Sequence, residues 1–341
     1  MKAAVLTAPG TIEIRDVEAP VPRANELLVK LKACGICTLE QRLFTGEMKA
    51  SYPVIPGHEA SGEVVAAGAD VLPGFPPGTR VALDLVLRCG ECYYCRTGQS
   101  NMCQNRFNAN HKALGGFGEF IAVKPTQAFP IPAGLSFEEA AFAEPVACCI
   151  HSLKKLGLRL AEDLLIMGAG PMGQLHLLVA SCMGARVFVS DPDAGRRETA
   201  MKAGAFAAID PAVGGLLPLI RERTEGRGVD ACVITSPAPA ALEAAFAAIC
   251  KTGRVNIYTA YADKPVIPID ANTLHRSEQT VTGSEGRTEI DFLQAVRLLC
   301  FGKVDVKPLI SRTIGYQGLE AGIRAAMTRE TYRVLLRHEG P

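Results

Sequence analysis

The sequence predicts an α/β fold in which a β-rich domain is joined to a doubly wound parallel sheet. Residues 1 to about 130 contain short apolar or alternating runs separated by turn residues, as expected of an all-β, loop-rich domain. From Asp163 onward, short apolar strands alternate with helical stretches, a pattern typical of a parallel sheet covered by helices. A helix-capping signal at Ser136 marks the change between the two patterns.

The β-rich part is defined by short runs with β-type alternation that end at turn residues. Prolines such as Pro53, Pro56 and Pro73 interrupt these runs, because proline cannot donate a hydrogen bond inside a sheet. The last strand before the pattern changes is expected at Glu119–Val123. Earlier strands are expected at Lys2–Leu6, Ile12–Val17, Glu26–Ala33 and Glu63–Ala67.

Helices begin where the sequence becomes rich in alanine. Ser136 and Glu139 have the spacing of a capping box, in which each side chain satisfies a backbone N–H group of the other residue. Proline is favoured at the first position of a helix, where its missing N–H group costs nothing. Pro145 is therefore expected to begin the next helix, which should continue over residues 146–156.

The second part is predicted to be a parallel sheet, because its strands and helices alternate along the chain. After this sheet, a helix over Ile290–Gly302 and a strand over Arg333–Leu336 are expected to return to the first part. The strands of the parallel sheet are expected at Leu164–Met167, Arg186–Ser190, Ala207–Ile209, Ala231–Thr235, Arg254–Tyr258 and Thr280–Gly283.

The composition excludes several classes of partner. The chain has 341 residues, of which 48% are hydrophobic, enough to form the cores of two domains. A net charge of +1 and the lack of any basic run argue against nucleic acid as a partner. No apolar run approaches the ~18 residues that span a bilayer, and no signal-peptide pattern is present, so no membrane association is expected. Twelve cysteines in such a chain indicate a reducing compartment, and we expect a cytoplasmic protein.

Four cysteines lie close together in a polar segment, spaced C-x₂-C-x₂-C-x₇-C over residues 89–103. Four thiolates can surround one Zn²⁺ ion tetrahedrally and leave no open position, which is the arrangement of a structural metal site. The alternatives are disulfides, which are rare in a reducing cytosol, and scattered buried thiols, which are not expected at this spacing in a polar segment. The predicted ligands of this four-cysteine lobe are Cys89, Cys92, Cys95 and Cys103.

A glycine-rich turn follows the first strand of the predicted parallel sheet. It has the pattern G-x-G-x-x-G and is followed by a helix, a second strand and an acid, the context in which this pattern binds a dinucleotide. The glycines let the backbone approach the pyrophosphate, and the helix N-terminus supplies N–H donors. The predicted cofactor-binding residues are Gly168, Gly170, Pro171, Met172, Gly173, Asp191 and Arg196.

The choice of cofactor depends on Asp191, which ends the second strand eighteen residues after Gly173. A carboxylate at this place accepts hydrogen bonds from the ribose hydroxyls and repels a 2′-phosphate, so NAD is expected rather than NADP. The alternative is that Asp191 caps the helix after Pro192. Arg196 either covers the adenine or lies in solvent with Arg197, and these two arginines leave NADP as a second possibility.

Four further residues form a candidate for a second metal site: Cys37, His58, Glu59 and Glu144. Each is ordinary by itself, because cysteines are often buried and a single histidine often belongs to a core or a surface. Together, a cysteine, a histidine and a carboxylate are the ligand set of a catalytic zinc ion that keeps one open position. The residues are distant in sequence, so spacing alone does not decide between these interpretations.

These motifs occur in the order found in zinc-dependent medium-chain alcohol dehydrogenases, which the chain resembles over essentially its whole length. The resemblance rests on Gly-Ile-Cys at residues 35–37, Gly-His-Glu at 57–59, the four-cysteine lobe and the GAGPMG turn at 168–173. The stretch Ala143–Cys148 is similar to the sorbitol (polyol) dehydrogenase branch, because threonine dehydrogenases usually carry Asp-Pro where this chain has Glu144-Pro145.

The resemblance implies a GroES-like catalytic domain over residues 1–145 and 286–341, and a Rossmann cofactor domain over residues 146–285. It implies two zinc ions per chain, NAD, and a homodimer or homotetramer. Cys37 and His58 would bind the catalytic zinc, while Glu59 and Glu144 share or exchange the remaining protein position. Adjacent residues of an extended chain point to opposite sides, so His58 and Glu59 can both bind only with a local distortion.

The sequence departs from the family after the cysteine ligand. The family usually has glycine, then serine or threonine, then aspartate, whereas this chain has Thr38, Leu39 and Glu40. Leu39 therefore stands where relatives have the hydroxyl that passes on the alcohol proton. A relay histidine of some relatives is replaced by Arg42. The departure leaves the proton path open.

The function expected from these features is the NAD-dependent oxidation of a secondary alcohol, either a polyol or a sugar derivative. Zinc would polarise the alcohol oxygen, and the nicotinamide would accept the hydride. One alternative is the same fold acting on an amino alcohol, a cyclitol or an aldehyde. Another is a zinc-stabilised NAD-binding protein that has lost its activity.

Overall fold

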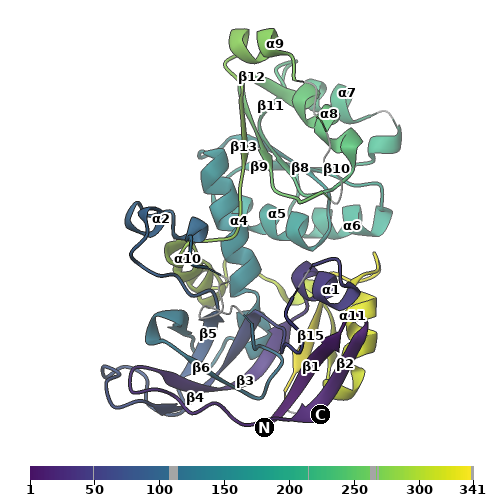
Figure 1. Cartoon of the computed structure of the whole chain (residues 1–341). Helices are drawn as coiled ribbons and strands as arrows, with labels where there is room; N and C mark the ends of the chain where they lie inside the picture. The colour runs from purple at the N-terminus through teal and green to yellow at the C-terminus, as the bar shows by residue number, and fades with distance from the viewer. Residues whose placement is uncertain (49, 107–113, 214, 262–265, 267–268, 339–341) are drawn as a thin grey trace. The chain divides into compact units, whose positions relative to one another are not determined.

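The computed structural model describes the chain except for residues 49, 107–113, 214, 262–265, 267–268 and 339–341. The backbone divides into two compact units (Figure 1). The first, which we call the catalytic unit, contains Met1–Ala147 and Arg287–Pro341. The second, which we call the nucleotide unit, contains Cys148–Gly286. The catalytic unit is thus built from two stretches of sequence that are far apart.

The catalytic unit contains a mixed sheet whose centre is β3 (Leu27–Gly35). The described part of this sheet has seven strands. Six follow the order β14-β15-β3-β4-β5-β7, and the seventh, β6, pairs with β3 beside this path. A separate hairpin joins β1 and β2 in antiparallel register. The strands are β1 Lys2–Ala8, β2 Thr11–Asp16, β4 Glu59–Ala67, β5 Arg80–Asp84, β6 Phe120–Val123, β7 Ala128–Pro130, β14 Ile310–Ile314 and β15 Arg333–Arg337.

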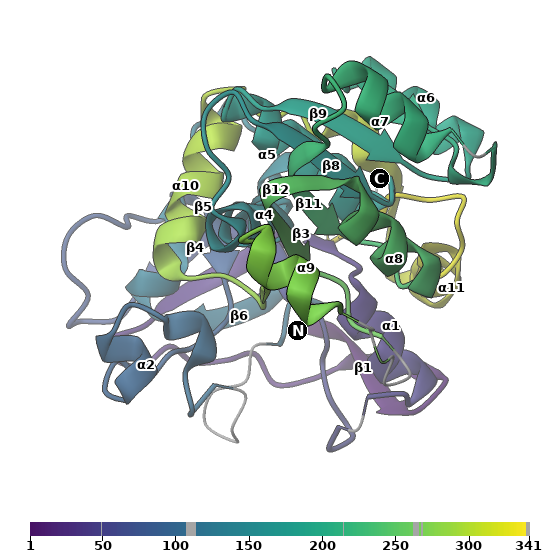
Figure 2. The same ribbon diagram turned by 90° about the horizontal axis from the view of Figure 1, so that it is seen from above.

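Short helices border this sheet. Helix α10 contacts β5 and lies beside it in both views (Figure 1; Figure 2). Helix α3 begins at a capping box in which the Ser136 hydroxyl accepts the N–H group of Glu139, as the sequence predicts. The helices of this unit are α1 Thr38–Thr45, α2 Tyr93–Arg96, α3 Phe137–Ala141, α10 Glu289–Cys300 and α11 Leu319–Ala326.

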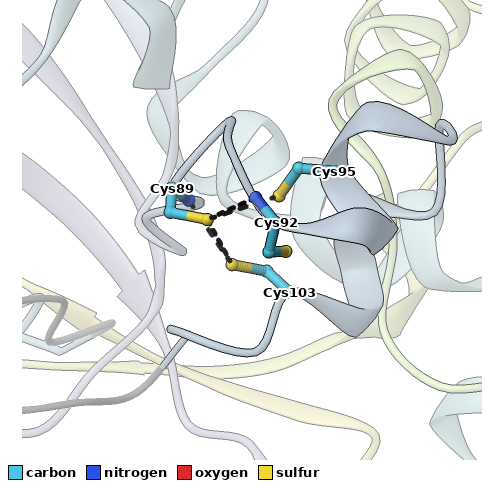
Figure 3. Close-up of side chains that lie close together, drawn as sticks. All are labelled: Cys89, Cys92, Cys95 and Cys103. Atoms are coloured by element: carbon cyan, nitrogen blue, oxygen red, sulfur yellow. Dashed lines mark hydrogen bonds between the residues drawn. The ribbon is translucent and has the colours of Figure 1, made fainter.

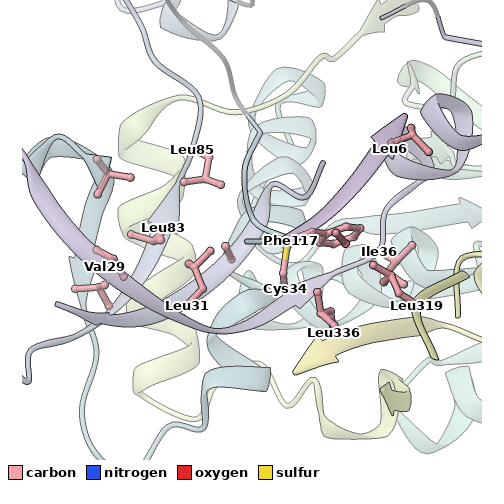
Figure 4. Close-up of a cluster of buried hydrophobic side chains, with 14 of the residues drawn as sticks. Leu6, Val29, Leu31, Cys34, Ile36, Leu83, Leu85, Phe117, Leu319 and Leu336 are labelled. Carbon is pink, nitrogen blue, oxygen red and sulfur yellow. The ribbon is translucent and has the colours of Figure 1, made fainter. Parts of the chain in front are cut away.

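The alternation of apolar residues along β3 and β4 produces the core of the catalytic unit. Leu27, Val29 and Leu31 lie on one face of β3 and have no exposed surface. Side chains from β5, β15 and α11 complete the cluster, together with Phe117 (Figure 4). Because β15 belongs to the second stretch of this unit, the core joins both stretches.

The nucleotide unit has a parallel sheet with helices on both faces. Its described strands follow the order β10-β9-β8-β11-β12-β13. Helices α5 and α6 cover one face, and α7 and α8 cover the other (Figure 1). The elements are β8 Asp163–Met167, α5 Pro171–Cys182, β9 Arg186–Ser190, α6 Ala194–Lys202, β10 Ala207–Ile209, α7 Leu216–Arg223, β11 Val229–Ile234, α8 Pro239–Ala248, β12 Ile249–Ile257, α9 Ala271–Arg276 and β13 Thr280–Gly283.

A buried polar cluster lies in the nucleotide unit. His176 has no exposed surface; its Nε2 lies 2.8 Å from Oγ of Ser152, and its Nδ1 lies 2.7 Å from the carbonyl oxygen of Met172. Asn256 of β12 donates to the same Ser152 hydroxyl over 2.8 Å. Each imidazole nitrogen thus has a partner, which buried polar groups require.

The predicted α/β class, with a β-rich domain and a doubly wound parallel sheet, is confirmed. One helix start is corrected. Helix α4 runs over Ala143–Leu156, so it begins two residues before Pro145. Proline fits at this third position because the N–H groups of the whole first turn lack helical partners. None of the helices in the described part of the chain combines the length and apolar character needed to cross a lipid bilayer.

Candidate functional site

Three of the predicted ligands of the second metal site lie together in the catalytic unit. One donor atom from each of Cys37, His58 and Glu59 lies within 4.8 Å of the other two. The register of the sheet explains this, because Gly35 at the end of β3 pairs with Glu59 at the start of β4. The residues that follow β3 and precede β4 therefore meet at one edge of the sheet.

His58 and Glu59 both reach the cluster although they are adjacent in sequence. The distortion that this requires lies just before β4, where Gly57 has a φ angle of +95°. A side chain at this glycine would also collide with Phe117, since its Cβ would be 2.6 Å from the ring. Glycine at position 57 thus allows the turn that brings both donors to one side.

Glu144, the fourth predicted ligand, lies next to these three. It belongs to the first turn of α4, and its Oε1 is 3.9 Å from Nε2 of His58. Its side chain is 8% exposed. A carboxylate oxygen therefore lies near Nε2 of His58, the ring nitrogen that would face a metal ion.

The surroundings of Glu59 fit a bound cation. Its Oε1 is buried and accepts no hydrogen bond of good geometry, although Nη2 of Arg333 lies 3.2 Å away. A Cβ atom at Gly35 would be only 2.0 Å from Oε2 of Glu59, so the site needs glycine there. Burial raises the pKa of Glu59 to about 7, while Arg333 opposes this rise and Glu144 adds to it.

Glu40 orients His58, which the sequence alone did not indicate. Its Oε1 lies 2.7 Å from Nδ1 of His58 and accepts the N–H group of Gly57 at 3.2 Å. Its Oε2 accepts the N–H group of Cys37 at 2.9 Å. A hydrogen bond at Nδ1 leaves Nε2 free to bind a metal ion. The available signal was the position of Glu40, three residues after Cys37, where a helix often carries a glutamate.

The charge of Glu40 also affects His58 without a metal. Burial lowers the pKa of His58, but the attraction of Glu40, a hydrogen bond with Cys37 and the charge of Glu144 together outweigh burial and hold it well above its ordinary value. A metal ion must therefore compete with a proton for this imidazole.

Two buried arginines complete the charge balance. Arg333 of β15 is paired with Glu59, and Arg287 is hydrogen bonded to Glu144. Each guanidinium group is about 5% exposed. Both arginines come from the second stretch of the catalytic unit, far from their partners in sequence. No local pattern could have identified them.

The positions where relatives carry a proton relay have no such chemistry. Leu39 packs against the core of the catalytic unit, and Thr38 is exposed at the start of α1. Arg42 pairs with Glu47 at 3.2 Å. The carboxylates that lie at the cluster are instead Glu40, Glu59 and Glu144.

The four predicted ligands of the lobe also lie together, with one sulfur from each within 4.8 Å of the others (Figure 3). Sγ of Cys89 accepts the backbone N–H group of Cys92 at 3.3 Å and lies 3.6 Å from Sγ of Cys103. Backbone hydrogen bonds, first from Cys92, lower the pKa of Cys89 to about 6. A thiolate is the form that binds metal ions, so Cys89 is ready to bind one. Burial raises the pKa of Cys95 to about 12, so a metal ion must displace the proton of that thiol.

The glycine-rich turn has the geometry that its motif predicts. Gly168 has a φ angle of +110°, and a Cβ atom at Gly173 would be 1.9 Å from the carbonyl oxygen of Gly168. Helix α5 begins at Pro171, with Gly170 as its N-cap residue. The next residue, Met172, lies in the first turn of α5, at the helix end whose positive dipole would face a phosphate.

Asp191 lies beside this turn. Its Oδ2 accepts the N–H group of Ala169 at 2.7 Å, and its Oδ1 accepts that of Asp193 at 2.8 Å. The cap of α6 is Asp193, so capping is not the role of Asp191. Arg197 is bound to the carbonyl oxygen of Asp191, whereas Nη1 of Arg196 lies 3.5 Å from where a Cβ atom of Gly170 would be.

A glycine-rich turn on a parallel sheet, together with a Cys-His-Glu cluster, defines a class of protein: a dinucleotide-binding dehydrogenase with a metal site. Comparison with known families agrees. Residues 23–133 match the alcohol dehydrogenase GroES-like domain, and residues 171–300 match the zinc-binding dehydrogenase domain. The chain belongs to the zinc-binding alcohol dehydrogenase family, in its sorbitol dehydrogenase-like branch, and is an oxidoreductase acting on alcohols.

Three similar proteins illustrate the relationship. D-arabitol-phosphate dehydrogenase of Enterococcus avium is 33% identical over 92% of this chain and 90% of its own length. Sorbitol dehydrogenase of Bacillus subtilis is 34% identical over 91% of this chain and 89% of its own. The crystal structure of a zinc-binding dehydrogenase from Sinorhizobium meliloti bound to NADP has a TM-score of 0.92 and 31% identity, covering 99% of both chains.

Proposed function

We propose that this protein oxidises a secondary alcohol of a polyol or sugar derivative to the ketone, with zinc and NAD. The observation that carries the proposal is the meeting of Cys37, His58 and Glu59 within 4.8 Å beside a buried arginine and a second carboxylate. Similarity to a polyol-phosphate dehydrogenase and to sorbitol dehydrogenase supports this substrate class.

In this proposal Cys37, His58 and one carboxylate hold the catalytic ion. Bound there, Zn²⁺ supplies Lewis-acid polarisation of the alcohol oxygen. Glu59 and Glu144 are both close enough to His58 to serve as the carboxylate. The carboxylate that does not bind the ion keeps its charge balanced by an arginine, which is Arg333 for Glu59 and Arg287 for Glu144. The four cysteines of the lobe hold a second, structural zinc ion.

The residues of the chain must also remove the alcohol proton. Leu39 cannot accept one, so a carboxylate of the cluster is the proposed acceptor. A carboxylate bound to a Zn²⁺ ion would stay ionised and weakly basic, so the base is the carboxylate that does not bind the ion. Burial raises the pKa of Glu59 to about 7 when no ion is bound, which suits a base that works near neutral pH. Glu144 is the other proposed acceptor.

The proposed cofactor residues are Asp191 for the ribose and the turn from Gly168 to Gly173 for the pyrophosphate. The carboxylate of Asp191 retains acceptor capacity beyond its two backbone partners. A nicotinamide held by these residues would supply the hydride acceptor. The Sinorhizobium meliloti dehydrogenase, which is 31% identical to this chain, is bound to NADP. The activities with NAD and with NADP must therefore be compared.

We also propose a homodimer or homotetramer. Strand β13 is at the edge of the parallel sheet and pairs on one side with β12. An exposed strand edge presents unpaired backbone groups, which a second copy can satisfy. Light scattering at micromolar concentration should give a mass of at least two chains.

A substrate panel tests the proposed activity. Polyols, sugar alcohols, their phosphate esters, cyclitols and threonine are incubated with NAD, and NADH is followed by its absorbance. Oxidation of a polyol or its phosphate at the highest kcat/KM supports the proposal. Preference for threonine or a cyclitol would move the protein to the alternative substrate class, and no turnover in zinc-loaded protein would favour a binding role.

A further inference from the structure

A chain of buried ion pairs connects the four-cysteine lobe with the carboxylate of Glu144. Arg88 directly precedes Cys89, the first cysteine of the lobe. We propose that Arg88 is a positioning residue that fixes Arg287, and through it the Glu144 carboxylate, from the base of the lobe. The inference rests on the two proposed metal sites. It concerns how the four-cysteine lobe fixes the position of a carboxylate at the Cys37–His58 site.

Asp84 is the link between the two arginines. Its Oδ1 lies 2.7 Å from Nη2 of Arg287, and its Oδ2 lies 2.7 Å from Nη1 of Arg88. Asp84 closes β5, and its side chain is 1% exposed, so water does not screen either pair. Gln127 donates to its carbonyl oxygen at 3.1 Å. An arginine on each oxygen limits the orientations that the Asp84 carboxylate can adopt.

Arg88 also contacts Arg287 directly, at the main chain. Its Nη2 donates to the carbonyl oxygen of Arg287 at 2.8 Å, while its Nη1 is bound to Asp84. The two contacts use the planar fork of one guanidinium group, a geometry that lysine cannot reproduce. Arg88 therefore fixes both the side chain and the backbone of Arg287.

Arg287 carries this constraint to the candidate metal site. Its Nη1 is hydrogen bonded to Oε1 of Glu144, the same oxygen that lies 3.9 Å from Nε2 of His58. The guanidinium carbon lies 5.8 Å from the ring centre of Phe292, which limits its movement on another side. A displacement of Arg287 would move the Glu144 oxygen relative to His58.

The lobe is itself fastened to α10 near this network. The Ser100 hydroxyl donates to Glu289, the first residue of α10, and Nε of Arg88 lies 3.5 Å from the same carboxylate. A metal ion held by Cys89 thus fixes the peptide next to Arg88. Filling the lobe should therefore stabilise the arginine that reaches toward the catalytic cluster.

Cobalt substitution tests the proposal without relying on activity. Co²⁺ replaces zinc at both sites, and the absorption bands of the four-thiolate site serve as an internal reference for those of the Cys37–His58 site. Arg88→Met removes the fork. Arg96→Met is the matched control, because Arg96 also adjoins a cysteine of the lobe but is exposed and outside the network.

Arg88→Met should keep two metals per chain and unchanged four-thiolate bands, while the bands of the Cys37–His58 site shift and kcat/KM falls about tenfold or more. Arg96→Met should leave the bands of the Cys37–His58 site and kcat/KM unchanged. Arg88→Lys should give a spectrum between those of wild type and Arg88→Met. Identical catalytic-site bands in wild type and Arg88→Met would overturn the proposal, as would an equal shift in Arg96→Met.

Two further results separate this proposal from the proposed function. If Arg88→Met loses the lobe metal, the bands of the Cys37–His58 site in Arg88→Lys are compared with those of wild type instead. Identical bands in Arg88→Lys and wild type would then reject the positioning role. Wild-type protein that binds fewer than two metals, or oxidises no alcohol, contradicts the proposed function instead, because that result does not depend on Arg88.

Discussion

Oε1 of Glu40 lies 2.7 Å from Nδ1 of His58, while Oε2 of the same carboxyl group accepts the backbone N–H group of Cys37. One buried side chain therefore orients an imidazole and closes the first turn of α1. The start of helix α1 and the orientation of His58, a proposed metal ligand, therefore depend on the same side chain.

Glu40→Gln should weaken metal binding at this cluster. The amide keeps the shape of the carboxylate but not its charge, and such changes next to a metal ligand typically cost 10–100-fold in affinity or activity. Competition with a chelator measures the affinity. Glu47→Gln, at an exposed position two residues beyond the end of α1, is the control. Equal zinc retention and equal activity in both variants would show that Glu40 does not orient His58.

Purified protein should contain two zinc ions per chain. Cys37→Ser should reduce the ratio to about one, because it removes a ligand of the Cys-His-Glu cluster. Cys103→Ser should also lose one ion, and it should lower the melting temperature, because structural zinc contributes folding energy. Elemental analysis gives the ratios. A ratio near one that Cys37→Ser leaves unchanged would exclude the catalytic ion.

NAD should be used with a higher kcat/KM than NADP. The carboxylate of Asp191, held by Ala169 and Asp193, repels a 2′-phosphate. Asp191→Ser should narrow the difference between the cofactors, whereas Asp210→Ser, which removes a partner of Arg197 outside the turn, should leave it largely intact. Equal or better use of NADP by the wild type would mean that Arg196 or Arg197 governs the choice.

A carboxylate should set the pH dependence of alcohol oxidation. A base acts only when deprotonated, so the rate should rise as pH increases through the pKa of the carboxylate that does not bind the ion. Burial raises the pKa of Glu59 to about 7 when no ion is bound. Glu59→Gln and Glu144→Gln remove one candidate each, and the variant lacking the base should lose this limb of the pH–rate profile. Zinc content is measured first. If both variants keep zinc and the wild-type profile, neither glutamate is the base.

His176 should make the folded protein less stable in mild acid. Burial lowers its pKa to about 4, whereas an unfolded histidine has a pKa of about 6.5. Between these values only the unfolded chain takes up the proton, so stability falls as pH decreases from about 6.5 to about 4, by about 3 kcal/mol. Below both values no further change comes from this residue.

Urea unfolding at neutral pH and near pH 4.5 measures this effect. Whatever the stability of His176→Gln at neutral pH, its loss of unfolding free energy between the two pH values should be smaller than that of wild type. His275→Gln, on the exposed surface of α9, is the matched control. His338, whose pKa burial also lowers to about 4, is present in all three proteins and cancels in the comparison. An equal loss in His176→Gln and wild type would contradict the prediction.

Short-range patterns in the sequence predicted structure accurately. Strands at Arg186–Ser190 and Ala207–Ile209 match β9 and β10 residue for residue, and the capping box at Ser136 forms as expected. The four cysteines of the lobe lie together because the turns between them are only two to seven residues long. In each case the interacting groups are neighbours along the chain.

Long-range contacts were not predictable from the residues alone. The cluster of Cys37 and His58 depends on the register of β3 against β4, which no single segment encodes. Arg287 and Arg333 reach Glu144 and Glu59 across more than 140 residues, as the numbering shows. Strands β5, β7 and β14 were also missed, since each is three to five residues long and lacks a clear alternation.

The catalytic unit is assembled from sequence on both sides of the nucleotide unit, and this has a consequence for its synthesis. The nucleotide unit, Cys148–Gly286, leaves the ribosome before β15 has been translated. Until then one edge of β3 is open at its last residues, 33–35, and Glu59 is without the guanidinium group of Arg333. A nascent chain therefore carries an exposed sheet edge and an uncompensated acid, both of which favour contact with chaperones over early closure.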